Sequence, residues 1–178
     1  IPAGTTHLRL YCYARSDRSA NSAGIDIQFN GDTGSNYNRQ TLVGRGTTVA
    51  AGIEATSRTA QIPAASSGAN EFGSSTTLIP WYASSSYRKQ TLSLTGAETH
   101  SDLGARLISG DWENTAAITS ITALCSDSAN FVAGSIFELE AITHPSGWSG
   151  DVMGVDNPAE VLGVEKANIE KVMGVAAG

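Results

Sequence analysis

The feature that most constrains this chain is a set of short segments in which apolar and polar residues alternate at every second position. In His7–Ala14, the side chains of Leu8, Leu10 and Cys12 fall on one face of an extended strand and the polar and tyrosine side chains fall on the other. Ile25–Phe29 repeats the pattern. A period of two is typical of half-buried β-strands and does not suit a helix.

Further segments of this kind follow, and turn-forming residues separate them. Asn30-Gly31, directly after Phe29, is the strongest short signal for a tight turn and predicts a hairpin. Ser35–Leu42 is a candidate for a single helical turn. The other candidate strands are Thr47–Ile53, Ser57–Ile62, Thr76–Trp81, Arg88–Leu94, Ala105–Ile108, Ala117–Cys125 and Ser135–Ile142. This pattern predicts an all-β fold, a jelly-roll-like antiparallel β-sandwich of eight strands with a short C-terminal extension.

The composition supports this fold class and excludes some functions. Charged residues make up only 16% of the 178 residues, and the 19 glycines are accompanied by abundant serine and threonine, which we expect to face outward from the strands. The net charge of −6 argues against nucleic acid as a partner. No apolar stretch approaches the roughly 18 residues of a membrane span, so no membrane insertion is expected. Cys12 and Cys125 lie in alternating apolar runs, which favours buried free thiols over a disulfide.

A boundary separates the sandwich from a C-terminal segment. The Pro- and Gly-containing stretch His144–Gly150 ends the strand pattern, giving a sandwich over residues 1–143 and an attachment or oligomerisation segment over 144–178. In that segment a Val-(Met/Leu)-Gly-Val motif begins at Val152, Val161 and Val172. The residues expected to form its contacts are Val152, Met153, Val155, Val161, Leu162, Val164, Ile169, Val172, Met173 and Val175.

Two local structures remain open for this segment. Asn157-Pro158-Ala159-Glu160 is a good helix start, with Asn as the N-cap and Pro at the first helical position. Against a helix, Gly163 would lie in its interior at a cost of about 1 kcal/mol. The alternative is a series of short strands turned at their glycines.

The stretches at residues 1–10, 29–37, 112–121 and 130–135 resemble parts of a β-sandwich domain of tailed-bacteriophage virion proteins, which is found in tail fibres and on particle surfaces. The resemblance spans roughly residues 1–142. The repeats of the C-terminal segment are similar to those that end many phage structural proteins. The resemblance implies a scaffold at the virion surface and no catalytic residues.

Two chemical motifs compete with this interpretation, both at the same turn. Asp32-Thr33-Gly34-Ser35 is the tetrapeptide of aspartic proteases, in which two aspartates share one proton. The chain holds no second such motif, and Asn30-Gly31 puts Asp32 in a turn rather than after an apolar strand. Asp32 with Asp26 or Asp111 is a candidate calcium site, but the ligand spacing is irregular, and hydrogen bonding within the turn is the favoured interpretation.

Aromatic residues provide another hypothesis. Trp81, Tyr82 and Trp112 are candidates for a platform on which a host surface glycan stacks, although Trp81 and Trp112 also suit the closed ends of a sandwich. The three histidines lack neighbours of the metal-ligand type, and no Gly-x-Ser-x-Gly elbow occurs. We therefore expect no cofactor and no metal site.

The sequence as a whole predicts a non-enzymatic structural protein of a bacteriophage particle, on the tail fibre or tip or as a capsid decoration protein. Its expected partners are other virion proteins and further copies of itself, with a trimer favoured. A carbohydrate-binding receptor-recognition domain is the alternative, and an aspartic protease is a remote one.

Overall fold

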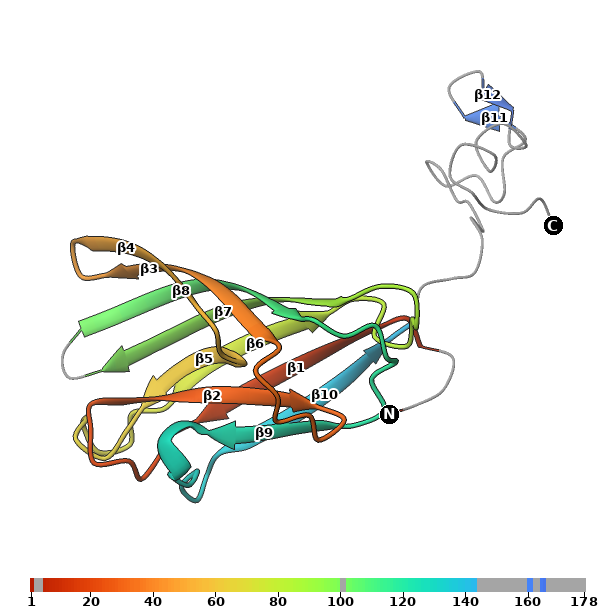
Figure 1. Cartoon of the computed structure of the whole chain (residues 1–178). Helices are drawn as coiled ribbons and strands as arrows, with labels where there is room; N and C mark the ends of the chain where they lie inside the picture. Colours follow the sequence, from red (N-terminus) through yellow and green to blue (C-terminus); the bar gives the residue numbers. More distant parts are fainter. Residues whose placement is uncertain (2–4, 100–101, 144–159, 162–163, 166–178) are drawn as a thin grey trace. The chain divides into compact units, whose positions relative to one another are not determined.

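The computed structural model describes residues 1, 5–99, 102–143, 160–161 and 164–165. The chain divides into two compact units, Ile1–Ile142 and Thr143–Gly178. Figure 1 labels the strands of both units.

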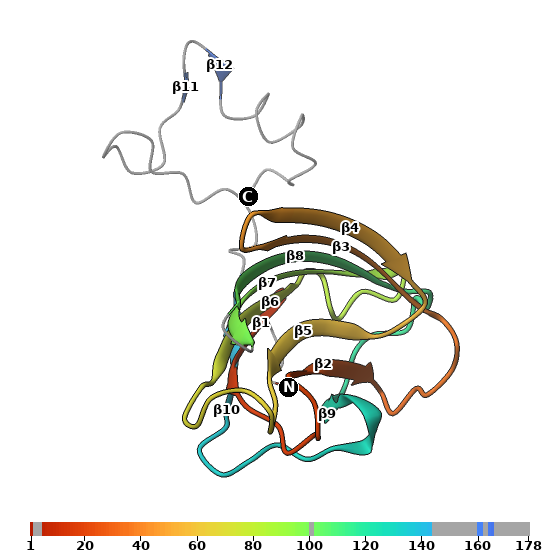
Figure 2. The ribbon, with the colours of Figure 1, turned by 90° about the vertical axis from the view of Figure 1, so that its left-hand side faces the viewer.

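The first unit is an antiparallel β-sandwich, which confirms the predicted fold class. A seven-stranded sheet has the order β10-β1-β6-β7-β8-β3-β4, and a three-stranded sheet has the order β5-β2-β9. Figure 2 shows the large sheet as an arc, with the small sheet against its inner side. The strands are β1 (His7–Ala14), β2 (Ser22–Phe29), β3 (Tyr37–Arg45), β4 (Thr48–Glu54), β5 (Arg58–Pro63), β6 (Gly73–Ile79), β7 (Lys89–Thr99), β8 (Asp102–Trp112), β9 (Ile121–Cys125) and β10 (Ile136–Ile142), and the 3-10 turn Ser126–Ser128 follows β9.

The number of strands differs from the expected eight, since ten occur in the described part of this unit. The prediction of a helical turn at Ser35–Leu42 was wrong, because these residues enter β3. Tyr37, Arg39 and Thr41 alternate as buried positions along that strand. Their side chains are polar or amphipathic, so the period of two is invisible as an apolar pattern.

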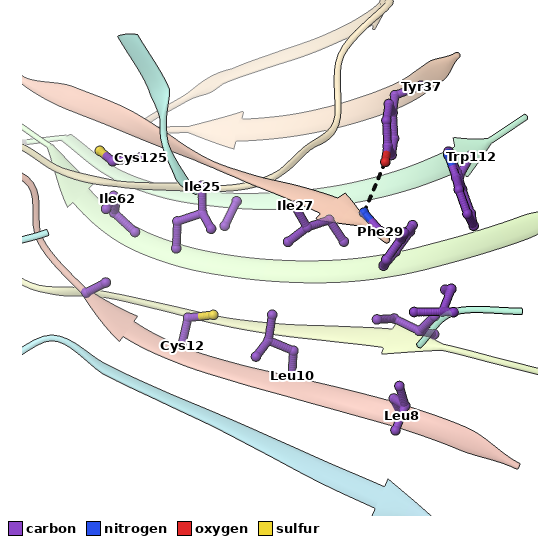
Figure 3. Packing of buried hydrophobic residues seen from close by; sticks show 14 of the residues in the cluster. Leu8, Leu10, Cys12, Ile25, Ile27, Phe29, Tyr37, Ile62, Trp112 and Cys125 are labelled. Atoms are coloured by element: carbon purple, nitrogen blue, oxygen red, sulfur yellow. Dashed lines mark hydrogen bonds between the residues drawn. The ribbon is translucent and has the colours of Figure 1, made fainter. Parts of the chain in front are cut away.

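The alternating apolar residues recognised in the sequence build the core between the sheets. Leu8, Leu10 and Cys12 of β1 face Ile25 and Ile27 of β2, and all five side chains are buried (Figure 3). Aromatic side chains close one end of this core, where the Phe29 ring lies 5.4 Å from Trp112 and 6.3 Å from Tyr37 between ring centroids. Both cysteines are buried and free, as predicted.

The Asn30-Gly31 turn forms as expected but does not make a hairpin. Asn30 (φ 55°) and Gly31 (φ 68°) both adopt the left-handed backbone that a type I′ turn needs, and the Asp32 N–H donates to the Phe29 carbonyl at 2.9 Å. The strands on either side belong to different sheets, since β2 is in the small sheet and β3 in the large one. The turn therefore carries the chain between the two layers.

In the second unit, Glu160–Val161 (β11) pairs antiparallel with Val164–Glu165 (β12). At these four residues the structure agrees with short strands and contradicts a helix that starts at Asn157. The physical reason is that the backbones of Glu160 and Val161 pair with those of Glu165 and Val164, a pattern that helical hydrogen bonding does not allow. The rest of the predicted extension lies outside the described residues.

Candidate interaction surface

The outer face of the large sheet, turned away from the small sheet, carries an exposed row of leucines. The strand register places Leu42 of β3 opposite Leu107 of β8, and Leu107 opposite Leu94 of β7. These side chains are 48%, 41% and 62% exposed, respectively. We call Leu42, Leu107 and Leu94 the leucine ridge. Three adjacent leucines facing solvent on a sheet are unusual, because the face of a sheet away from the core normally carries polar residues.

A hollow runs beside the leucine ridge. Two residues further along each strand the register aligns Gly44, Ala105, Gly96 and Ser74 across four strands. We call these four residues the glycine trough, and with the ridge they line a hollow of about 560 Å³. A Cβ atom on Gly44 would meet nothing within 4 Å, and one on Gly96 only the Ser74 hydroxyl at 3.8 Å. The trough therefore exists because side chains are absent, not because the backbone is crowded.

The apolar surface continues to the edge of the sheet. All seven residues of β4 are exposed, and Val49 and Ile53 on the outer face are each 76% exposed. β4 ends the order of the large sheet, so among the described strands none pairs with its far side. On the other half of the same face, Arg9 forms an ion pair with Glu140 at 3.2 Å. The leucine ridge, Val49 and Ile53 thus form an apolar area over β3, β4, β7 and β8 that does not include this ion pair.

The sequence did not predict this surface because β7 buries its polar residues and exposes its leucines. Thr91, Ser93 and Thr95 point inward and are buried, whereas Leu92 and Leu94 point outward. The expectation that serine and threonine face outward was therefore wrong on this strand. The buried Thr77 and Ser93 hydroxyls bond each other at 2.9 Å, which lets a polar pair occupy the interior. The alternation Thr-Leu-Ser-Leu-Thr is visible in the sequence. Whether the leucines or the polar residues point inward depends on which layer covers each face of the strand.

The aspartic-protease motif is a structural turn. The Asp32 carboxylate accepts hydrogen bonds from the Gly34 N–H, the Asn36 amide and the Trp112 indole N–H, each at 2.8 Å. The bonds from Asn36, Gly34 and Trp112, in that order of effect, lower the pKa of Asp32 below its ordinary value. A second aspartate does not contact it among the described residues. Although the four residues of the motif, Asp32–Ser35, line a hollow of about 300 Å³, an ionised carboxylate with three donors is a poor general acid.

The candidate calcium site, Asp32 with Asp26 or Asp111, does not form in the described structure. Asp26 lies 3.5 Å from Arg58, and Asp111 lies 3.6 Å from Arg88. Both carboxylates are thus paired with arginines instead of facing Asp32. In the described part of the chain, no group of three or more His, Cys, Asp or Glu side chains is placed to hold a metal ion.

The predicted glycan platform is contradicted for two of its three residues. Trp112 and Tyr82 are buried in the core, at 1% and 4% exposure, because they close the end of the sandwich. Trp81 is 56% exposed, and its ring packs edge-on against His7 with 5.1 Å between centroids. Trp81 follows the end of β6 and adopts φ 49°, so it belongs to a turn rather than to the predicted strand.

The residues predicted to attach the C-terminal segment are only partly within the structure. The backbones of Val161 and Val164 pair with each other in β11 and β12. The remaining predicted residues, Val152, Met153, Val155, Leu162, Ile169, Val172, Met173 and Val175, lie outside the described residues.

No family model, curated protein or solved structure matches this chain. Within the described residues, no helix is long and apolar enough to cross a membrane.

Proposed function

We propose that this chain is a non-enzymatic structural protein of a bacteriophage particle, and that its sandwich assembles with a second copy through the outer face of the large sheet. The observation that carries the proposal is the leucine ridge beside the glycine trough, both exposed on one face. The resemblance to phage β-sandwich domains supports the location on a particle, at the tail fibre or tip or on the capsid surface. The C-terminal segment would attach the sandwich to other virion proteins.

A second copy fits this face because ridge and trough are parallel neighbours. Consider a two-fold axis in the plane of the interface, parallel to both features and midway between them. Rotation about that axis puts the ridge of one copy over the trough of its partner, and the reverse contact follows by symmetry. Neither feature contains a charged residue, so the ridge and the trough themselves bring no like charges together.

The strength of this contact is expected to be modest. Full burial of one leucine is worth about 1.5–3 kcal/mol, and the ridge leucines are already about half-buried in the isolated chain. Association costs at least about 4 kcal/mol in lost freedom of motion. We therefore expect a dimer that depends on protein concentration and is strengthened where a particle holds many copies close together.

The test of self-association is light scattering across a concentration series of the full chain. Leu94→Lys should shift the protein to monomer, because it places a charge in the ridge, and Gly96→Leu should do the same by filling the trough. Leu124→Lys is the matched control, since Leu124 is an exposed leucine on β9 in the small sheet. A wild-type monomer at all concentrations, or Leu94→Lys behaving like Leu124→Lys, would refute the proposed contact.

Two further measurements separate the parts of the proposal. A trimer, the number expected from the sequence, would contradict the two-fold contact and point to a head-to-tail interface. Deletion of residues 146–178 should leave the dimer intact if the sandwich face forms it. Mass spectrometry of purified phage particles from the genome that encodes this chain tests the virion role, which fails if the chain is absent from them.

A carbohydrate-binding role is the second candidate, supported by a single observation. Trp81 and Tyr87 are both exposed in the segment between β6 and β7, at 56% and 70%. Exposed aromatic rings in one segment suit the apolar faces of sugar rings. Host polysaccharide should then change tryptophan fluorescence in the wild type and not in Trp81→Ala; no change in the wild type would exclude this role.

A further inference from the structure

The edge strand β4 lies open on both faces and along one side. Every residue of Thr48–Glu54 is exposed, so no layer of the described structure covers this strand. β4 ends the order of the large sheet and pairs with β3 alone among the described strands (Figure 2). The backbone N–H and C=O groups on its far side therefore have no strand to bond in the described part of the chain.

β4 also lacks the features that keep most edge strands from pairing with another chain. Natural edges are protected by proline, by charged side chains, lysine above all, or by a bulge. Thr48–Glu54 contains no proline or lysine, and its register with β3 runs along the whole strand without a shift. Its single charged residue, Glu54, stands at the end of the strand and forms an ion pair with Arg39 of β3. Val49–Ile53 is therefore an unprotected, uncharged edge.

The opposite edge of the large sheet, β10, is protected against pairing with itself. Glu138 and Glu140 stand on either side of Leu139, the central residue of Ile136–Ile142. Two copies of β10 paired antiparallel about Leu139 would place Glu138 of each copy opposite Glu140 of the other. Like charges directly opposite each other destabilise a sheet. Of the two edges, only β4 is thus suited to contact its own copy.

All seven residues of β4 can pair with a second copy in one antiparallel register. In that register a two-fold axis passes through the central residue, Ala51, and places it opposite Ala51 of the second copy. Val49 then lies opposite Ile53, so two side chains that are each 76% exposed gain a cross-strand neighbour. Glu54 lies opposite Thr48, and the two Glu54 residues are about 20 Å apart along the strands. No like charges on β4 therefore meet.

The same register extends the leucine ridge. Ala51 lies opposite Leu42 in the pairing of β4 with β3, in line with Leu107 and Leu94. The two-fold axis is perpendicular to the sheet, so the outer faces of both copies lie on the same side. The ridge of one copy then continues through the two Ala51 residues into the ridge of the other, and the pairing of the edges doubles the length of this apolar row.

We infer that β4 is a self-pairing edge, at which a second copy of this chain joins its large sheet antiparallel to the first to form one continuous sheet. Seven residues a side are far fewer than the roughly 20–30 residues a side of a stable interface. We therefore expect the contact at protein concentrations on the order of 1 mM, as where a particle holds many copies, and not in dilute solution. The contact uses the edge and not the outer face, so it does not depend on the proposed function.

Cysteine crosslinking of the full chain tests the register. Ala51→Cys places two thiols opposite each other on the axis, whereas Val49→Cys, also exposed on β4, places them about 13 Å apart, beyond the reach of a disulfide. Both variants are made together with Leu94→Lys, which removes the outer-face contact, and are treated with oxidised glutathione at about 1 mM protein. Cys12 and Cys125 are buried and do not compete.

On non-reducing gels, we expect Ala51→Cys to form the covalent dimer about tenfold faster or more than Val49→Cys, because paired strands hold its thiols together. Equal rates for the two variants would indicate random collision and would overturn the inference. The absence of a covalent dimer from both variants would overturn it as well, because the two copies then do not meet at this edge.

Hydrogen exchange of the β4 amides is a second readout that needs no cysteine. In Leu94→Lys, exchange should be fast in dilute protein and slower at about 1 mM, when the edge is paired. Adding Ala51→Lys should abolish this slowing, because two ammonium groups would face each other on the axis, whereas the control Leu124→Lys on β9 should retain it.

Slow exchange of β4 already in dilute protein would show that another part of the chain covers this edge, and would overturn the inference. So would slowing that persists in Ala51→Lys. The outer-face contact is decided separately, by the effect of Leu94→Lys alone on the mass in light scattering, so either contact can fail without the other.

Discussion

The indole of Trp112 joins the buried core to the Asp32 turn, and Trp112→Phe tests that link. The indole N–H donates to the Asp32 carboxylate at 2.8 Å, and the ring stacks near Tyr37 at 6.3 Å and Phe29 at 5.4 Å between centroids. Phenylalanine keeps an aromatic ring in this cluster but removes the donor. The change therefore separates the hydrogen bond from most of the packing.

The magnitude follows from the burial of Trp112, which is 1% exposed. Complete truncation of a buried aromatic residue costs about 3–5 kcal/mol. We expect the loss of unfolding free energy in Trp112→Ala to lie at the upper end of that range. Trp112→Phe should lower the free energy of unfolding by roughly 2–3 kcal/mol, from the lost bond and the part of the ring that is not replaced.

The pH dependence identifies the carboxylate. The pKa of Asp32 is lowered below its ordinary 3.8, so its hydrogen bonds contribute stability above pH 3.8 that is lost as the pH falls through the lowered pKa. Trp112→Phe removes one of three donors and lets that pKa move back towards 3.8. The stability difference between wild type and variant should therefore narrow once the pH falls below the lowered pKa of Asp32.

The assay is urea unfolding followed by circular dichroism at neutral and acidic pH, repeated in an Asp32→Asn background as a double-mutant cycle. In that background, Trp112→Phe should cost less at neutral pH and the narrowing should disappear. If Trp112→Phe lowers the free energy of unfolding equally with Asp32 and with Asn at position 32, and at both pH values, the indole acts through packing alone.

Two further predictions concern buried titratable groups. Burial raises the pKa of Cys12 from 9.0 to about 11, so at pH 8 its thiolate fraction is about a hundredfold smaller than for an ordinary thiol. A disulfide reagent should leave Cys12 unmodified in the native chain and modify it in urea; rapid native modification would contradict this burial. Burial lowers the pKa of Lys89, whose ammonium donates to the Tyr87 and Thr115 carbonyls at 2.7 and 3.0 Å. The unfolded chain holds that proton more tightly, so the wild type should gain stability relative to Lys89→Met as the pH rises from the lowered pKa towards 10.5. Urea unfolding of both proteins over this pH range measures the gain, and parallel profiles of stability against pH would refute it.

The sequence was sufficient for the parts of the fold in which aliphatic residues mark the buried face. β1 and β2 follow the predicted alternation, and Cys12 and Cys125 are buried free thiols as expected. The Asn30-Gly31 turn was also predictable, because few dipeptides adopt two left-handed conformations in succession. These features depend on interactions between residues close in the chain, which local patterns record.

The sequence was insufficient where distant residues meet. The Asp32 turn was recognised, but its bond to Trp112 spans 80 positions in the chain. The sequence made Trp112 a candidate for sugar stacking, but the packing of the two sheets buries its side chain. Four arginines are dispersed in the sequence, yet strands from both sheets bring Arg39, Arg45 and Arg58 close enough to Arg106 to repel its charge.

The alternation of small polar and large apolar residues along β7 could be read with either face inward, and only the tertiary structure decided which. The leucines face outward because the inner positions of β7 are taken by small polar residues, of which Ser93 bonds Thr77 of the neighbouring strand β6. The sequence of a strand sets the alternation of its side chains, whereas the layer that covers the strand decides which of its two faces is buried. The amino-acid sequence therefore determined that this chain is a β-sandwich, and the pairing of its strands determined that it exposes a leucine ridge.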